Sequence, residues 1–149
     1  MILVTVGSTH FDELIEEIDH LVQIEIITDQ VVFQIGNGEY IPKFGSHYRF
    51  NKNIAENFKS ADLIITHGGL TTLQILKMGQ DFIAISNTNL QDDHQTLFLT
   101  QLSKYTPIRW SNSPKDVEKL LKQAVSTEIN QASKPDIAQK IYQYNNFNT

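Results

Sequence analysis

The feature that most constrains the fold of this 149-residue sequence is a regular alternation of short apolar runs with longer amphipathic segments. The four runs are Met1–Val6, Val31–Ile35, Leu63–Thr66 and Phe82–Ile85. An almost wholly apolar run has no polar face, which is typical of a strand buried on both sides in a parallel sheet. Two shorter strands are predicted near Tyr48–Phe50 and at Pro107–Trp110.

The segments between these runs have the spacing of helices that bury one face. In Phe11–Val22, apolar residues recur every three or four positions, so one stripe of this helix faces the sheet. Further helices are predicted at 54–61, 70–79, 92–103 and 114–125, the last with Pro114 in its first turn behind Ser113 as cap. Strands that alternate with helices predict right-handed βαβ units, and so an α/β fold with one doubly wound parallel sheet.

Length and composition limit the class of protein further. The length is typical of one domain covering 1–149, in which 126–135 is expected to be a linker and 136–146 a final helix. The net charge of −5 argues against a general nucleic-acid binder, and the lack of cysteine removes disulfides and thiolate zinc sites. No apolar run approaches the roughly 20 residues of a membrane helix, so we expect a soluble, cytoplasmic chain.

In a doubly wound sheet, ligands bind beyond the carboxyl ends of the strands, so the loops there are the places to look for a site. Gly7, Ser8 and Thr9 follow the first strand and precede a helix. Small residues let backbone amides approach a phosphate at such a helix N-terminus, although a tight turn without a ligand is the alternative. The segment has neither the later glycines of a dinucleotide-binding fingerprint nor the Gly-Lys-Ser/Thr of a Walker loop.

The segment from Thr66 to Gln74 carries the strongest signal. His67, Gly68 and Gly69 stand between a buried strand and a helix, and Thr71 and Thr72 add hydroxyl groups to the first turn. Bare amides at this edge predict a neutral, metal-free cradle for a diphosphate, with Gln74 one turn further on, able to reach a ribose hydroxyl. The alternatives are a capped helix behind a glycine turn, and a hydrogen-bonded loop histidine.

A third polar loop spans Asn87–Gln95. Asp92 and Asp93 suit helix capping, whereas His94 and Gln95 suit hydrogen bonds to sugar hydroxyls. A metal site is disfavoured because no second histidine stands at ligand spacing. We therefore expect no metal and no other cofactor.

Taken together, these segments resemble a known family. The segments Thr5–Ile15, Phe33–Gly38 with Pro42, Ala61–Gly69 and Asp92–Gln95 are similar to the small catalytic subunits of two-part UDP-N-acetylglucosamine transferases. The resemblance covers residues 2 to about 103, and it extends to bacterial split transferases of capsule and exopolysaccharide synthesis. The whole group is similar to the C-terminal domain of glycosyltransferase family 28, so the expected fold is the Rossmann-like C-terminal half of a GT-B glycosyltransferase.

The resemblance implies roles for the candidate residues. It places Gly7, Ser8 and Thr9 along the cleft between the two halves of the enzyme, and the backbone near Phe50 and Asn51 against the uracil. The residues from Gly68 to Thr71 would hold the diphosphate, Gln74 the ribose, and His94 and Gln95 the donor sugar. The expected UDP-sugar-binding residues are Gly7, Ser8, Thr9, Phe50, Asn51, His67, Gly68, Gly69, Leu70, Thr71, Gln74, Asp93, His94 and Gln95.

The resemblance also implies partners. A separate, membrane-anchored subunit would bind the lipid-linked saccharide acceptor and supply the general base, and the helix 136–146 would dock on that subunit. The expected function is the donor-binding, catalytic subunit of a split inverting glycosyltransferase. The alternative is a non-catalytic accessory homologue, favoured by one departure from the family: Gln74 stands where a glutamate usually contacts the ribose, and a neutral acceptor binds hydroxyls more weakly than a charged one.

Overall fold

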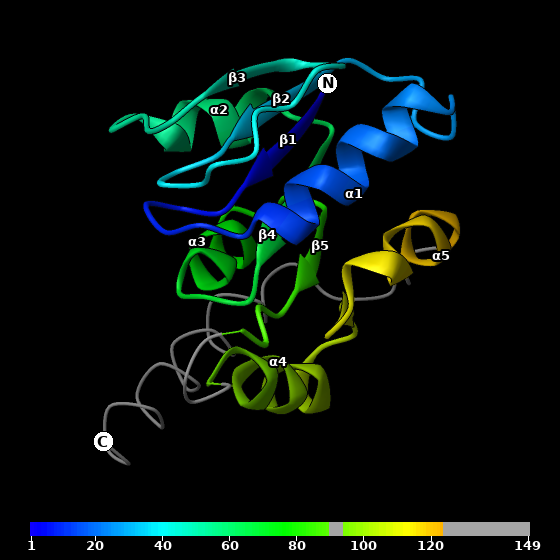
Figure 1. The fold of residues 1–149 in the computed structure, drawn as a ribbon. Helices are drawn as coiled ribbons and strands as arrows, with labels where there is room; N and C mark the ends of the chain where they lie inside the picture. Colours follow the sequence, from blue (N-terminus) through cyan, green and yellow to red (C-terminus); the bar gives the residue numbers. More distant parts are fainter. Residues whose placement is uncertain (90–93, 124–149) are drawn as a thin grey trace.

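The structure is a computed structural model that describes residues 1–89 and 94–123. Its centre is a six-stranded, wholly parallel sheet with the strand order β3-β2-β1-β4-β5-β6 (Figure 1). The strands are β1 (Ile2–Thr5), β2 (Val31–Gln34), β3 (Ser46–Tyr48), β4 (Leu63–His67), β5 (Phe82–Ile85) and β6 (Arg109–Ser111). This confirms the predicted α/β class and the doubly wound parallel sheet.

Helices cover both faces of the sheet. They are α1 (Asp12–Gln23), α2 (Ile54–Ser60), α3 (Thr71–Lys77), α4 (His94–Tyr105), a 3₁₀ turn (Pro114–Asp116) and α5 (Val117–Lys122). One buried cluster contains the apolar residues of α1 and α5, and a second contains those of α2, α3 and α4. The sheet is thus the middle of three layers, as expected of an α/β fold.

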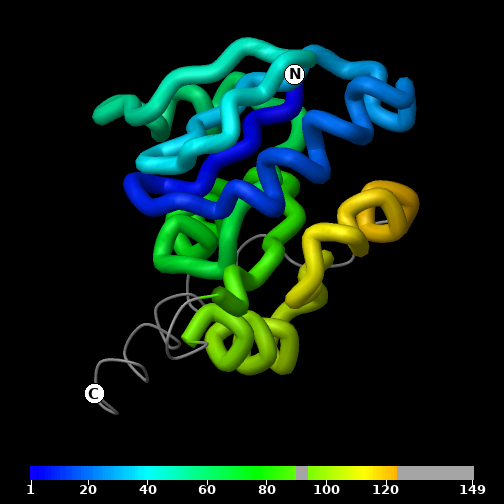
Figure 2. The backbone as a smooth tube through the Cα atoms, viewed as in Figure 1, coloured from blue at the N-terminus to red at the C-terminus, as the bar shows by residue number. Residues whose placement is uncertain are grey.

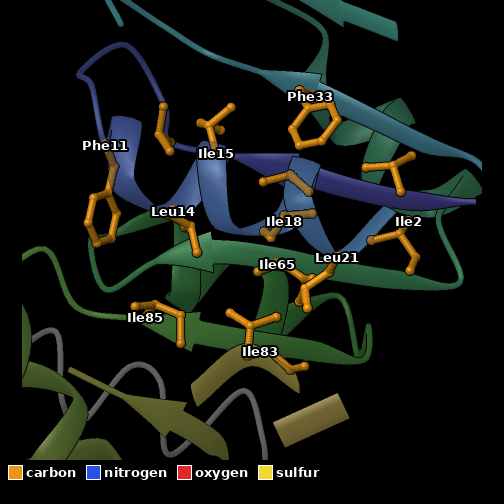
Figure 3. Close-up of a cluster of buried hydrophobic side chains, with 14 of the residues drawn as sticks. Ile2, Phe11, Leu14, Ile15, Ile18, Leu21, Phe33, Ile65, Ile83 and Ile85 are labelled. Atoms are coloured by element: carbon orange, nitrogen blue, oxygen red, sulfur yellow. The ribbon is translucent and has the colours of Figure 1, made fainter. Parts of the chain in front are cut away.

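The apolar runs are explained by this burial on both faces. In β1, Ile2 and Val4 belong to the cluster under α1, whereas Leu3 belongs to the opposite cluster. Figure 3 shows the first of these clusters, in which Leu14 and Ile18 of α1 lie over the strands. Because side chains alternate between the faces of a strand, a strand with two buried faces has to be apolar at nearly every position.

The main differences from the sequence prediction lie at the edges. Strand β3 is Ser46–Tyr48 rather than Tyr48–Phe50, and β6 is Arg109–Ser111 rather than Pro107–Trp110. Both are outer strands of the sheet, where less burial leaves a weaker apolar pattern.

The predicted helix 114–125 is a 3₁₀ turn followed by α5, and Pro114 does lie in its first turn. Ser113 makes no side-chain cap. The neighbouring Ser111 hydroxyl instead donates to Asp116 Oδ2 at 2.5 Å and accepts from the Ser113 N–H at 3.1 Å.

The strand order creates a switch point between β1 and β4. The chain winds from β1 outward to β3 in one direction, and from β4 to β6 in the other. The loops after β1 and β4 therefore lead to helices on opposite faces of the sheet, α1 and α3. Thr5 is paired with Thr66 at the ends of these strands, and the Thr66 hydroxyl donates to the Thr5 carbonyl at 3.0 Å. In doubly wound sheets, the crevice at this point is where ligands bind.

Three predicted features lie outside the described residues: the linker 126–135, the helix 136–146 and the capping pair Asp92 and Asp93. Within the ranges 1–89 and 94–123, no helix combines the length and apolar character needed to span a bilayer.

Helix α4 packs closely on the loop between β4 and α3. A methyl group added at Gly68 would lie 2.8 Å from Leu99 Cδ1 and 3.0 Å from Gln95 Cβ, both on α4. Leu99 is fully buried, so it has little room to move away. Gly68 therefore sets how closely α4 approaches the end of β4.

We expect Gly68→Ala to lower the free energy of unfolding by about 1–3 kcal/mol because it overpacks this contact. The measurement is denaturant unfolding of Gly68→Ala, Leu99→Ala and the double variant. Because Leu99→Ala removes the atoms that the new methyl group meets, Gly68→Ala should cost less in that background. An equal cost in both backgrounds would contradict the packing role.

Candidate functional site

The loops that leave the carboxyl ends of the strands are joined to one another by hydrogen bonds. Gln34 at the end of β2 donates through Nε2 to the Gly7 carbonyl at 3.0 Å, and the Asn37 N–H donates to the Thr9 carbonyl at 2.9 Å. In Figure 2, the loops after β1 (blue) and β2 (cyan) accordingly lie side by side. The loop after β5 is joined to the loop after β1 as well, because Asn87 donates through Nδ2 to the His10 carbonyl at 3.1 Å.

The loop after β1 turns at Gly7. Its φ of 67° lies in the left-handed region, which suits glycine, and its N–H donates to the Thr5 hydroxyl at 3.2 Å. A methyl group there would lie 3.3 Å from His67 Nε2, so the loops after β1 and β4 approach one another at this residue. Ser8 and Thr9 are exposed, and the Thr9 hydroxyl donates to the Val6 carbonyl at 3.0 Å.

The loop after β4 carries the predicted diphosphate residues. The Gly68 N–H donates to Gln95 Oε1 at 3.1 Å, and a methyl group at Gly69 would lie 2.4 Å from His67 Cε1. The space beside Gly69 is therefore filled by the His67 ring. Leu70 is 67% exposed, and Thr71 begins α3 with its side chain partly exposed.

Two polar residues of α3, Thr72 and Gln74, differ in their burial. Thr72 is fully buried, and its hydroxyl donates back to the His67 carbonyl at 3.3 Å, so it stabilises the loop and is not presented to a ligand. Gln74, one turn into the helix, is exposed. The N–H groups of Thr72 and Leu73 donate to the carbonyls of Gly69 and Leu70, each at 3.0 Å. Donor capacity at the start of α3 is therefore left to the backbone N–H groups of residues 69–71, which precede the first bonded turn.

Gln95 joins the loops after β4 and β5. Its Oε1 accepts from the Gly68 N–H and, at 2.8 Å, from the Asn87 N–H, while its Nε2 lies 3.1 Å from His67 Nδ1. The pKa of His67 is lowered from its usual value by burial of the ring. The ring is therefore neutral at physiological pH. Both the oxygen and the nitrogen of the Gln95 carboxamide therefore have partners within the protein.

The predicted uracil residues lie beyond β3. Phe50 is 59% exposed, and Asn51 accepts from the Asn53 N–H at 2.9 Å. Arg49, which the sequence prediction missed, lies beside them and donates through Nη1 to the carbonyls of Gly36 and Gly38 at 3.0 and 2.8 Å. It thus places an exposed positive charge next to the glycine loop after β2. Arg49 directly follows β3, and no motif in the sequence around it indicated a role.

The third polar loop is described only in part. Asp93 lies outside the described residues, and His94 is exposed at the first residue of α4. Among residues 1–89 and 94–123, no group of three His, Asp or Glu side chains is arranged to hold a metal ion.

A separate groove of about 560 Å³ lies on the outer side of α1. It is bordered mainly by acidic side chains of α1, with Tyr40 and Lys115 on its other walls, and Lys115 pairs with Glu17 at 2.7 Å. None of the predicted site residues borders this groove, so the switch point remains the candidate site.

Comparison with known proteins gives the family. Residues 1–145 match the glycosyltransferase family 28 C-terminal domain. The chain is 33% identical over 115 residues to the human protein named UDP-N-acetylglucosamine transferase subunit ALG13, and 33% identical over 135 residues to the mouse protein of that name. These matches take in 69% and 79% of this chain, but only 10% and 12% of the length of the relatives.

Solved structures show the same fold. MurG of Acinetobacter baumannii aligns with 96% of this chain and 45% of its own, at a TM-score of 0.60 and 22% identity. The glycosyltransferase SnogD of Streptomyces nogalater aligns with 95% and 39%, at a TM-score of 0.58 and 20% identity. The solution structure of ALG13 aligns with 95% and 96%, at a TM-score of 0.58 and 15% identity.

The fold is thus the Rossmann-like fold of the C-terminal half of a GT-B glycosyltransferase, as predicted. With a family match over nearly its whole length and two relatives at 33% identity, this chain belongs to the glycosyltransferase family 28 C-terminal domain family.

Proposed function

We propose that this chain is the donor-binding subunit of a split inverting glycosyltransferase that moves a sugar from a UDP-sugar to a lipid-linked saccharide. The observation that carries the proposal is the meeting of Gly7, His67 and the start of α3 at the switch point of the sheet. Membership of a glycosyltransferase family supports it. The name of the human and mouse relatives, a subunit of a UDP-N-acetylglucosamine transferase, supports it too.

The proposed cradle binds the diphosphate through uncharged donors. The backbone N–H groups of Gly69, Leu70 and Thr71 stand at the positive end of α3, and negative charge builds up on the departing UDP as the bond to the sugar breaks. Fixed donors of this kind can stabilise that charge without a metal ion. The Gly68 N–H contributes indirectly, because Gln95 holds it and so holds the loop.

The other parts of the donor have proposed positions around this cradle. Gln74 is exposed one turn into α3, where its carboxamide is available to the ribose hydroxyls. The backbone near Phe50 and Asn51 would contact the uracil. His94 would face the sugar, and Ser8 and Thr9 would line the cleft towards the second half of the enzyme.

The proposal assigns the acceptor to another chain. A general base, which typically contributes roughly 10²–10⁴-fold to the rate, would come from a membrane-anchored, acceptor-binding subunit. This chain would then lie at the cytoplasmic membrane surface through that subunit. Capsule or exopolysaccharide synthesis, which the resemblance raised, finds no support among the mammalian relatives and stays a prediction.

We expect the purified chain to bind UDP saturably in titration calorimetry and Gln74→Glu to tighten that binding, because a carboxylate accepts from both ribose hydroxyls with a charge-assisted bond. The gain should be about two- to tenfold. Gln80→Glu adds the same charge beyond the end of α3 and should leave the affinity unchanged. A protein that gives no saturable heat would favour the accessory homologue, and equal or weaker binding by Gln74→Glu would argue against the ribose contact.

We expect Gly69→Val to abolish UDP binding while the fold is retained, because a branched side chain beside the N–H groups of the cradle would block the close approach of the diphosphate. Since that side chain also displaces His67, which lies 2.4 Å from the position of its Cβ, His67→Ala is the matched control. His67→Ala removes one contact and should leave measurable UDP binding. An unchanged UDP affinity in Gly69→Val would remove the diphosphate assignment.

The proposed function also predicts how the chain behaves in a turnover assay. Because the proposed base lies on a partner, the chain alone should show no sugar transfer from UDP-N-acetylglucosamine to a lipid-linked saccharide, and addition of an acceptor-binding subunit should restore it. The measurement is incorporation of radiolabelled sugar into the lipid fraction. Full-rate transfer by the chain alone would contradict a split enzyme.

A further inference from the structure

The carboxamide of Gln95 has its orientation fixed by its partners. Two backbone N–H groups, those of Gly68 and Asn87, point at one end of it at 3.1 and 2.8 Å. Backbone N–H groups can only donate, so the atom that they meet must be the carbonyl oxygen. The amino group of the carboxamide therefore faces His67 Nδ1, at 3.1 Å.

This orientation decides where His67 carries its proton. A carboxamide amino group can only donate, so Nδ1 of the ring has to accept, and the single proton of a neutral imidazole then lies on Nε2. An imidazolium would set an N–H group against the amino group of Gln95. The buried surroundings of the ring also lower its pKa, because burial disfavours the charged form.

The described groups packed around the His67 ring carry no charge that would shift its protonation. Gly7 from the loop after β1 faces Nε2, and Gly69 from the ring's own loop lies against Cε1. Gln95 from α4 faces Nδ1. Among the described residues, these facing groups are neutral, so the tautomer is set by the hydrogen bond from Gln95 and not by an ion pair.

We propose that Gln95 is a positioning residue that fixes His67 as the neutral Nε2–H tautomer, so that a permanent N–H donor points toward the Gly7 loop at the switch point. The ligand class that this donor fits is an anionic oxygen of a diphosphate, which can only accept. This part rests on the proposed function. In this role the Gln95 carboxamide acts on the UDP-sugar through His67. The resemblance had instead implied a direct contact between Gln95 and the sugar.

Gln95→Glu separates this role from a merely structural one. A carboxylate still accepts from the N–H groups of Gly68 and Asn87, so the connection between the loops is kept. Its second oxygen replaces the amino group opposite Nδ1 and accepts a hydrogen bond from an N–H at Nδ1. The variant should therefore move the His67 proton to Nδ1 and raise the pKa of the ring, because a nearby negative charge favours the imidazolium.

The test is long-range ¹H–¹⁵N NMR of the histidine rings in the free chain, with the His67 signals assigned by their loss in His67→Asn. We expect a neutral Nε2–H ring at pH 8 in the wild type, and an Nδ1-protonated or doubly protonated ring in Gln95→Glu. Gln101→Glu makes the same change on α4 and should leave His67 as in the wild type. A wild-type Nδ1–H tautomer, or the same His67 titration in Gln95→Glu, would overturn the proposal.

Binding of UDP-N-acetylglucosamine tests the link to the ligand, since its diphosphate does not titrate between pH 6 and 8. Wild-type affinity should be constant over this range. Gln95→Glu should bind about tenfold more weakly at pH 8 and recover as the pH falls and Nε2 regains its proton. The expected tautomer without any binding would sink the proposed function alone, whereas binding with the wrong tautomer would sink only the role of Gln95.

Discussion

The pairing of β1 with β4 is the contact on which the candidate site depends. Four residue pairs, from Ile2–Leu63 to Thr5–Thr66, hold these strands in parallel at the centre of the sheet. Because the chain winds away from them in opposite directions, none of the helices in the described ranges 1–89 and 94–123 crosses the gap between their carboxyl ends. This leaves Gly7 and His67 facing each other at the carboxyl edge of the sheet.

The burial of the sheet made most of the fold predictable. Phe82–Ile85 is a strand with the predicted bounds, because all four of its side chains are buried between two helical layers. The outer strand Ser46–Tyr48 was misplaced by two residues, since Ser46 and His47 are exposed and leave no apolar signal. Predictions from apolar patterns therefore hold where burial is complete and weaken towards the edges of the sheet.

For the candidate site, the sequence predicted which loops form it but not the hydrogen bonds between them. The loops at Gly7 and His67 could be identified because each follows a predicted strand, and the carboxyl ends of parallel strands lie at one edge of the sheet. The bonds within the site depend on contacts between residues far apart in sequence, such as Gly68 with Gln95, and no local pattern encodes them. The same holds for Thr72, whose hydroxyl was expected at the ligand side and instead contacts the His67 carbonyl.

The hydrogen bonds between the loops also limit how these loops can move. Gln34, Asn87 and Gln95 connect the segments after β1, β2, β4 and β5 into one network, and each such bond contributes about 1 kcal/mol. A single loop cannot fold over a bound molecule without breaking several of them. Sealing the crevice from water then calls for rigid-body closure of this whole unit against a second body, with the hinge outside the network.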